Sequence, residues 1–403
     1  MTGSCVVVEG NGTVRTVQRP AVAAALTAAV LLSAGCSSSG STGGDGTASG
    51  SPPASSAAAS SGGPSSEDSP APAKGSVKVV STLTTGLKSP WGLAPLPDGD
   101  LLVSSRDEGT ITRIDAKNGK KSLVGTVPGV APGGEGGLLG IALSPSYAAD
   151  HLVYAYFTTA SDNRIARMLY DEKQPAGRRL GAPDTIFKGI PKGMIHNGGR
   201  IAFGPDKMLY AGVGETGERG LAQEKEKVSG KILRMTPDGQ PALGNPESDS
   251  VIYTYGHRNV QGLAWDAGNR LWAAEFGQDT WDELNLIEPG KNYGWPVVEG
   301  QEGKEGYVDP VEQWHTSNAS PSGIAIVQGS VWMAGLRGER LWRIPLNGSK
   351  PAADPQAFLE GEYGRLRTVV AAGGDRLWLV TSNTDSRGTP SSGDDRILQL
   401  EVR

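Results

Sequence analysis

The chain has 403 residues, a formal net charge of −5, two cysteines, 58 glycines and 27 prolines. The negative charge argues against a nucleic-acid partner, for which a basic surface is expected. Only 6% of the residues are aromatic, and no stretch keeps a helical period, so the glycine- and proline-rich composition predicts an all-β protein with many turns.

The first 35 residues have the pattern of an export signal. Two arginines precede an apolar run over residues 21–32, which is shorter than the ~20 residues of a spanning helix. Small residues then lead to Cys36, so the segment resembles a bacterial lipoprotein signal. We expect cleavage after residue 35, lipidation of Cys36, and a membrane-anchored protein that faces the extracellular side. An ordinary secretory signal is the alternative, and export follows from both interpretations.

Residues 36–75 consist almost entirely of Ser, Gly, Ala, Pro and Thr. Such a segment cannot bury enough apolar surface to offset its conformational entropy, so we expect a disordered tether. The folded domain is then expected over residues 76–403. Cys5 lies in the removed segment, which leaves the folded domain without a disulfide, a thiolate metal site or a cysteine nucleophile.

A repeated pattern runs through this domain. Each copy has an apolar strand, a turn, a second apolar strand, a polar loop and a third strand. The six copies begin near residues 92, 140, 200, 262, 323 and 368. A spacing of roughly 40–60 residues is typical of four-stranded units, so we predict a six-bladed β-propeller. Residues 77–83 are expected to close the ring with the last blade; a β-sandwich with repetitive turns is the alternative.

One histidine stands among the polar motifs. His196 lies in the stretch HNGGR, residues 196–200, directly before an apolar strand. Histidine has an ordinary pKa near neutrality and is therefore a natural proton acceptor. Gly198 and Gly199 permit positive φ angles and close approach of another group. The alternative is a histidine that merely caps a strand.

Propeller geometry predicts where the polar residues meet. The residues before each innermost strand and the loops after each second strand share one mouth of the central channel. The first set contains Glu135, His196, Arg258, Asn259, Ser320, Pro321, Arg365, Leu366 and Arg367, and the second contains Arg106, Glu215, Gly277, Gln278 and Arg337. Several arginines around one histidine favour an anion site, because guanidinium groups bind carboxylates through paired hydrogen bonds.

Four segments carry an ordered set of motifs: GEGGLLG at 134–140, HNGGR at 196–200, YGHRNVQG at 255–262, and 282–296, which begins DELN and ends NYGWP. This set resembles the glucose/sorbosone dehydrogenase family, the soluble quinoprotein aldose sugar dehydrogenases. The resemblance implies a six-bladed propeller that carries pyrroloquinoline quinone (PQQ) over the channel mouth, together with calcium.

The resemblance also implies roles for individual residues. His196 would be the general base that takes the proton of the sugar C1 hydroxyl as hydride passes to the quinone, and Glu215 would orient it. The cofactor would be held by Glu135, His196, Arg258, Asn259, Arg337, Arg365 and Arg367. One calcium ion would take backbone oxygens from Gly277 and Gln278 and polarise the quinone carbonyl, and a structural calcium would lie at Glu283 and Tyr293.

The implied activity is PQQ- and Ca²⁺-dependent oxidation of aldoses to lactones, with an external electron acceptor. Two alternatives share the fold: a non-catalytic protein that binds a sugar or an anion, and a calcium-dependent, lactonase-like hydrolase. The histidine among arginines favours the dehydrogenase, because a calcium hydrolase needs carboxylate and amide ligands that point into the channel.

Overall fold

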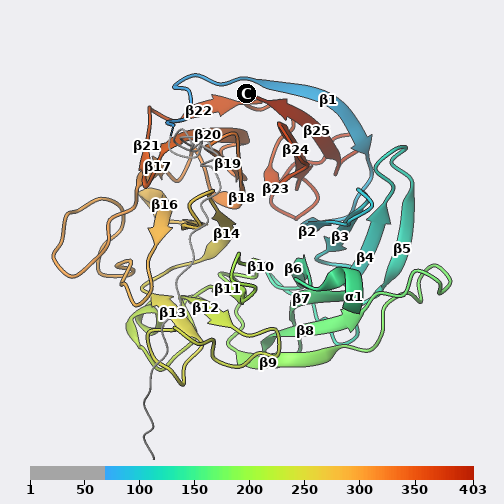
Figure 1. Ribbon diagram of the computed structural model, residues 1–403, viewed down its shortest axis with the longest axis horizontal. Helices are drawn as coiled ribbons and strands as arrows, with labels where there is room; N and C mark the ends of the chain where they lie inside the picture. The colour runs from blue at the N-terminus through green and yellow to red at the C-terminus, as the bar shows by residue number, and fades with distance from the viewer. Residues whose placement is uncertain (1–68) are drawn as a thin grey trace, which may run out of the picture. The chain divides into compact units, whose positions relative to one another are not determined.

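The computed structural model describes residues 69–403. The expected signal, Cys36 and the tether up to residue 68 lie outside the described residues. Six antiparallel sheets surround a central channel (Figure 1). This arrangement confirms the six-bladed β-propeller. Across residues 69–403, none of the helices is both long and apolar enough to cross a membrane.

The blades follow one another along the chain, each running from the channel outward. Blade 1 has β2 (Pro90–Pro95), β3 (Leu101–Ser105), β4 (Thr110–Ile114) and β5 (Lys121–Thr126); blade 2 has β6 (Leu138–Leu143), β7 (Leu152–Thr158), β8 (Asn163–Leu169) and β9 (Asp184–Ile190), with α1 (Tyr147–Asp150); blade 3 has β10 (Ile201–Phe203), β11 (Leu209–Val213), β12 (Lys231–Met235) and β13 (Ile252–Tyr255), with the 3-10 helix η1 (Arg219–Gln223).

The remaining blades complete the ring. Blade 4 has β14 (Val260–Trp265), β15 (Leu271–Glu275), β16 (Trp281–Ile287) and β17 (Glu312–His315); blade 5 has β18 (Pro321–Val327), β19 (Ser330–Gly335), β20 (Arg340–Asn347), β21 (Lys350–Pro351) and β22 (Gln356–Phe358); blade 6 has β23 (Leu366–Ala371), β24 (Arg376–Thr381), β25 (Ile397–Val402) and β1 (Val77–Thr84).

Strand β1 closes the ring as predicted. It pairs antiparallel with β25, so that Val77 lies opposite Val402 and Thr84 opposite Ile397. The first described strand is therefore the outermost strand of the last blade (Figure 1). This pairing covers the outer edge of β25, an edge that would otherwise be open to another chain.

Glycines on the innermost strands explain the repeated sequence pattern. A Cβ at Gly140 would lie 2.2 Å from the carbonyl oxygen of Gly199, and one at Gly262 would lie 2.5 Å from that of Ser322. A side chain at these positions would clash with the neighbouring blade. Glycine at this position, which four of the six innermost strands share, therefore lets these strands pack closely against the next blade.

The first described residues lie on blade 5. The amide of Ala71 donates to the carbonyl oxygen of Leu346 at 2.9 Å, and the buried Arg343 donates from Nη2 to that of Pro72 at 2.8 Å. Ala71 is 7% exposed. The tether was expected to reach residue 75, but residues 71–75 belong to the folded domain, because these backbone groups find partners on the blade.

Candidate active site

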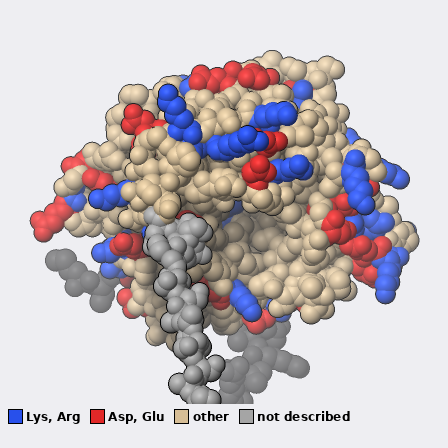
Figure 2. Space-filling view, turned by 45° about the horizontal axis from the view of Figure 1, so that its top comes forward, with Lys and Arg blue, Asp and Glu red and all other residues tan. Residues whose placement is uncertain are grey.

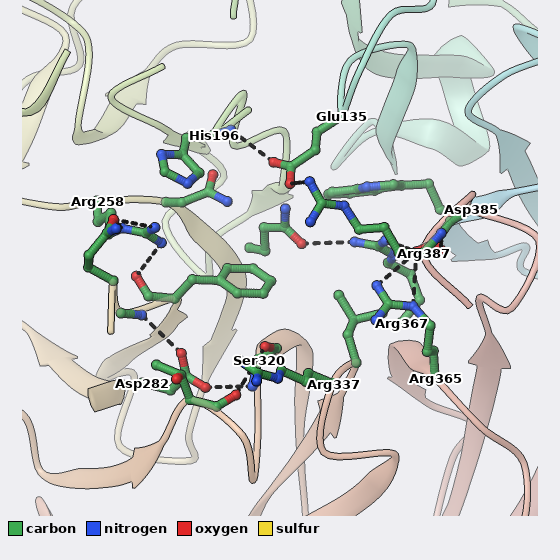
Figure 3. A pocket seen from close by; sticks show the side chains of 18 of the residues that line it. Glu135, His196, Arg258, Asp282, Ser320, Arg337, Arg365, Arg367, Asp385 and Arg387 are labelled. Atoms are coloured by element: carbon green, nitrogen blue, oxygen red, sulfur yellow. Dashed lines mark hydrogen bonds and ion pairs between the residues drawn. The ribbon is translucent and has the colours of Figure 1, made fainter. Parts of the chain in front are cut away.

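A cavity of about 560 Å³ opens at one mouth of the channel (Figure 3). It is lined by nine of the predicted site residues: Glu135, His196, Arg258, Asn259, Gly277, Gln278, Arg337, Arg365 and Arg367. Arg106 and Ser320 also line it, as the propeller geometry predicts. Glu215 lies behind His196, whereas Glu283 and Tyr293 line a separate small cavity.

His196 is held by a buried carboxylate. Its Nδ1 lies 2.5 Å from Oε1 of Glu215, which is 1% exposed. When Nδ1 carries the proton and donates it to this carboxylate, Nε2 has a free lone pair. Because His196 lines the cavity, the pair is arranged so that the imidazole can accept a proton from a bound ligand.

The bend that presents His196 depends on glycine. His196 itself has a φ of 53°, and Gly198 and Gly199 have φ values of 64° and 106°. A Cβ at Gly198 would lie 2.3 Å from the carbonyl oxygen of Gly212. The HNGGR sequence therefore encodes a tight bend that brings the imidazole to the mouth of the channel rather than along a strand.

Glu135 joins His196 to another blade. Its Oε2 accepts the backbone N–H of His196 at 2.8 Å, and its Oε1 forms an ion pair with Nη2 of Arg387 at 2.8 Å (Figure 3). The carboxylate is therefore paired, which makes its presence beside a predicted anion site electrostatically acceptable.

Arg258 is fixed by the loop after β15. Its Nε and Nη2 donate to Oε1 of Gln278 at 3.2 and 2.8 Å, and its Nη1 donates to the carbonyl oxygen of Phe276 at 3.3 Å. Burial lowers the pKa of Arg258 from its ordinary value, although nearby carboxylates including Glu215 oppose the shift. The neighbouring Asn259 accepts the amide of Gly198 at 3.0 Å. Both side chains, which were predicted to bind a cofactor, are thus held in place by hydrogen bonds.

Two further arginines share one carboxylate. Oδ2 of Asp385 accepts Nη2 of Arg365 at 3.0 Å and Nη2 of Arg367 at 2.9 Å. Burial raises the pKa of Asp385, but the two guanidinium groups outweigh it and hold the pKa at about 2. Burial lowers the pKa of Arg367 to about 10, so this side chain is still protonated at neutral pH.

Sequence reasoning missed Asp385 and Arg387. Both lie in the loop after β24, the second strand of blade 6, which is the same position that led to Arg106 and Glu215 in other blades. Applying the same rule to the sixth copy of the repeat finds them.

The cavity carries an excess of positive charge. Six arginines line it, Arg106, Arg258, Arg337, Arg365, Arg367 and Arg387, against three carboxylates, Glu135, Asp282 and Asp385. The formal excess is three positive charges. On the face of the molecule shown in Figure 2, basic and acidic side chains lie interspersed, so this excess is a property of the cavity rather than of a generally basic surface. Such a cavity suits a polyanionic ligand.

The loop at residues 277–281 presents backbone oxygens. Oε1 of Glu299 accepts the amides of Gln278, Asp279, Thr280 and Trp281 at 2.7–3.2 Å. In a trans peptide the C=O points opposite to the N–H, so the carbonyls of residues 277–280 point away from Glu299. The oxygens of Gly277 and Gln278 receive no hydrogen bond from residues 69–403. They fit a hard cation.

The second predicted metal position is a cavity of about 10 Å³, enough for one ion or water. Glu275, Glu283, Glu299 and Tyr293 line it. Burial and the nearby Glu275 raise the pKa of Glu283 to about 8. Behind these two carboxylates, Asn285 donates from Nδ2 to both, and its buried Oδ1 has no partner among the described residues. These features suit a cation.

Acidic side chains alone do not complete either position. In the described part of the chain, no three His, Cys, Asp or Glu side chains are grouped so that they could hold a metal ion. A bound cation would therefore need backbone or amide oxygens as well, which calcium accepts readily.

The fold and the site define a propeller of the sugar dehydrogenase class. The chain belongs to the glucose/sorbosone dehydrogenase family, whose model matches residues 87–389. Among proteins of known structure, it is similar to the PQQ-bound form of aldose sugar dehydrogenase from Streptomyces coelicolor, with 74% identity and a TM-score of 0.82 over 83% of this chain and 100% of that one.

Relatives in other bacteria support the same class. The chain is 28% identical to the aldose sugar dehydrogenase of Escherichia coli over 78% of this chain and 92% of that protein. It is 30% identical to quinoprotein glucose dehydrogenase B of Acinetobacter calcoaceticus over 56% of this chain and 54% of that protein.

Proposed function

We propose that this protein oxidises aldoses at the C1 hydroxyl to lactones with PQQ and Ca²⁺ as cofactors. The observation that carries the proposal is the His196–Glu215 pair in a cavity with an excess of three positive charges. The similarity to a PQQ-bound aldose sugar dehydrogenase supports it.

The charge of the cavity matches the proposed cofactor. PQQ is a planar tricarboxylate. The cationic and amide side chains that would hold its carboxylates are Arg258, Asn259, Arg337, Arg365 and Arg367, and Glu135 and His196 would lie beside it. Arg337 is exposed, and its guanidinium forms no hydrogen bond or ion pair with the rest of residues 69–403, so it is available to a ligand. When bound, PQQ supplies a two-electron quinone acceptor, and calcium at Gly277 and Gln278 would make it more electrophilic.

The protein's own groups handle the proton. Nε2 of His196 would take the proton of the C1 hydroxyl as the C1–H bond is broken. Glu215 would stabilise the resulting imidazolium, because its carboxylate lies against Nδ1 in a buried setting. The sugar loses two electrons and two protons in total, and an external electron acceptor would regenerate the oxidised cofactor.

The geometry favours this activity over a calcium-dependent hydrolase. The three carboxylates of the cavity already have partners: Glu135 pairs with Arg387, Asp385 with two arginines, and Asp282 accepts the amides of Gly277 and Ser320. They hold protein groups in place rather than point freely into the cavity. The assay described below distinguishes the proposed enzyme from a non-catalytic protein that binds a sugar or an anion.

Location is proposed from the sequence. The signal over residues 1–35 and Cys36 would export the protein and anchor it by a lipid outside the cell membrane. The tether would then separate the propeller from the lipid.

The proposal is tested with the mature chain from residue 36 carrying Cys36→Ser, which removes the lipidation site. This protein is incubated with PQQ and Ca²⁺ and assayed with a panel of aldoses and an electron-accepting dye. We expect dye reduction that requires both additions and a sugar. PQQ binding without turnover of any aldose would favour the binding-protein alternative, and lack of PQQ binding would refute the proposal.

A further inference from the structure

Arg200 lies in the channel below the cavity, where it contacts Trp91 and Gln261, two residues of the cavity lining. Arg200 is 8% exposed. Its Nε donates to the carbonyl oxygen of Gln261 at 2.7 Å, and its Nη2 donates to Oγ1 of Thr368 at 3.0 Å. Its Cζ lies 4.4 Å from the centroid of the Trp91 ring. All of these partners are neutral.

The opposite end of the channel offers no counter-charge. A second cavity of about 300 Å³ is lined by the later halves of the innermost strands, and Arg200 is the only charged residue that lines it in the described part of the chain. Its other lining residues include Leu93, Ile141, Phe203 and Leu263. Arg200 is therefore without a carboxylate partner on this side as well.

The nearest charged neighbour has the same sign. Arg367 also lies over the Trp91 ring, with its Cζ 5.9 Å from the centroid, and its Nη1 donates to Oε1 of Gln261 at 3.0 Å. Burial, and then the charge of Arg367, lower the pKa of Arg200 to about 9. Arg367 has Asp385 as its partner, whereas Arg200 has none.

A buried cation without a counter-charge destabilises a folded protein. The two residues that Arg200 contacts from below, Trp91 and Gln261, both line the cavity that has the excess of positive charge. An anionic ligand bound in that cavity would therefore bring a negative charge close to Arg200.

We propose that Arg200 is a positioning residue whose charge, held beneath the floor formed by Trp91 and Gln261, is compensated only when an anionic ligand binds above it. This inference rests on the proposed function and adds a determinant of cofactor affinity that does not touch the cofactor. The buried charge destabilises the unliganded protein. A bound polyanion is attracted to it, and this attraction is strong because Arg200 is buried, where charges are poorly screened.

The test compares three variants of the full mature protein. Arg200→Met removes the charge and keeps an unbranched apolar side chain, and Arg200→Lys keeps the charge but loses the planar guanidinium. Arg343→Met is the matched control: Arg343 is 1% exposed, has neutral partners in Gln356 and Pro72, and lies in blade 5 away from the cavity. The PQQ dissociation constant and the melting temperature of the unliganded protein are measured for each.

We expect Arg200→Met to weaken PQQ binding by at least about tenfold, Arg200→Lys to stay within about threefold of the wild type, and Arg343→Met to leave the dissociation constant unchanged. The unliganded Arg200→Met protein should melt no lower than the wild type. Equal loss of affinity in the methionine and lysine variants would overturn the proposal, because hydrogen bonding rather than charge would then be responsible. Unchanged affinity in Arg200→Met would overturn it too.

The experiment also distinguishes a failure of the proposed function from a failure of the proposed role of Arg200. A wild-type protein that binds no PQQ refutes the cofactor, and the same variants are then compared with citrate, another tricarboxylate. A charge-dependent difference between Arg200→Met and Arg200→Lys in citrate binding would uphold the role of Arg200, and its absence would overturn it.

Discussion

Oε1 of Glu215 lies 2.5 Å from Nδ1 of His196, and the carboxylate is 1% exposed. Because Nδ1 is bonded to Glu215, Nε2 is the ring nitrogen that can accept a proton. The second oxygen of Glu215 has no hydrogen-bond partner among the described residues. Within residues 69–403, the imidazole of His196 is therefore the only hydrogen-bond partner of this carboxylate.

Glu215→Gln should reduce turnover while PQQ still binds. The amide keeps the shape but removes the negative charge that stabilises the imidazolium, so we expect kcat to fall by about 10²–10⁴-fold. Dye-reduction kinetics and PQQ binding measure the two effects. Glu218→Gln, an exposed acid three residues further on, is the control and should change neither. Full activity in Glu215→Gln would contradict the orienting role.

Glu135→Gln should strengthen PQQ binding. The amide oxygen can still accept the N–H of His196, but the ion pair with Arg387 is lost and one negative charge leaves the cavity. We expect the dissociation constant to fall by about three- to tenfold. The exposed Glu305→Gln is the control for a change in net charge. Weaker binding in Glu135→Gln would show that the ion pair shapes the site more than its charge opposes the cofactor.

Asp385 should contribute stability that disappears in acid. Its pKa in the folded protein, about 2, lies below the ordinary 3.8, so its contribution is present above pH 4 and is lost as the pH falls toward 2. The shift corresponds to about 2 kcal/mol. Urea unfolding at several pH values should show Asp385→Asn less stable than the wild type at pH 7, with the difference shrinking below pH 4. A pH-independent difference would indicate a packing effect instead.

Residues 69–75 should stabilise the propeller. Ala71 is buried, and its amide and the carbonyl of Pro72 are bonded to blade 5. We expect a protein that starts at residue 76 to lose about 1–3 kcal/mol of unfolding free energy relative to one that starts at residue 69. The midpoints of urea unfolding measure this loss. Equal midpoints would mean that the segment contributes no stability to the propeller.

The glycines of the innermost strands make the repeat, and therefore the fold, predictable from the sequence. Gly140 and Gly262 mark innermost strands because only glycine fits against the next blade, so the repeat is visible in one sequence. The same repeat predicts which arginines reach the cavity, since equivalent loops share one mouth of the channel. The sequence also predicts a closing strand at residues 77–83, and the pairing of β1 with β25 confirms it.

Pairings between distant loops were not predictable. Glu135 is recognisable as a site residue, but nothing in its surroundings shows that Arg387 will reach it from blade 6. Arg200 lies in the same HNGGR motif as His196, yet it faces the channel below the cavity. Its direction depends on two successive glycines with positive φ, whose angles the residue types permit but do not fix.

The most direct test of the central claim is to measure PQQ binding and sugar-dependent dye reduction on the same preparations of wild type and His196→Asn. Asparagine can hydrogen-bond but cannot act as a base at neutral pH. The account predicts that the variant still binds PQQ, with an affinity at most about tenfold weaker because only one of several cofactor contacts is changed, and loses at least about 10²-fold in kcat. A variant that binds PQQ and still oxidises aldoses at the wild-type rate would contradict it.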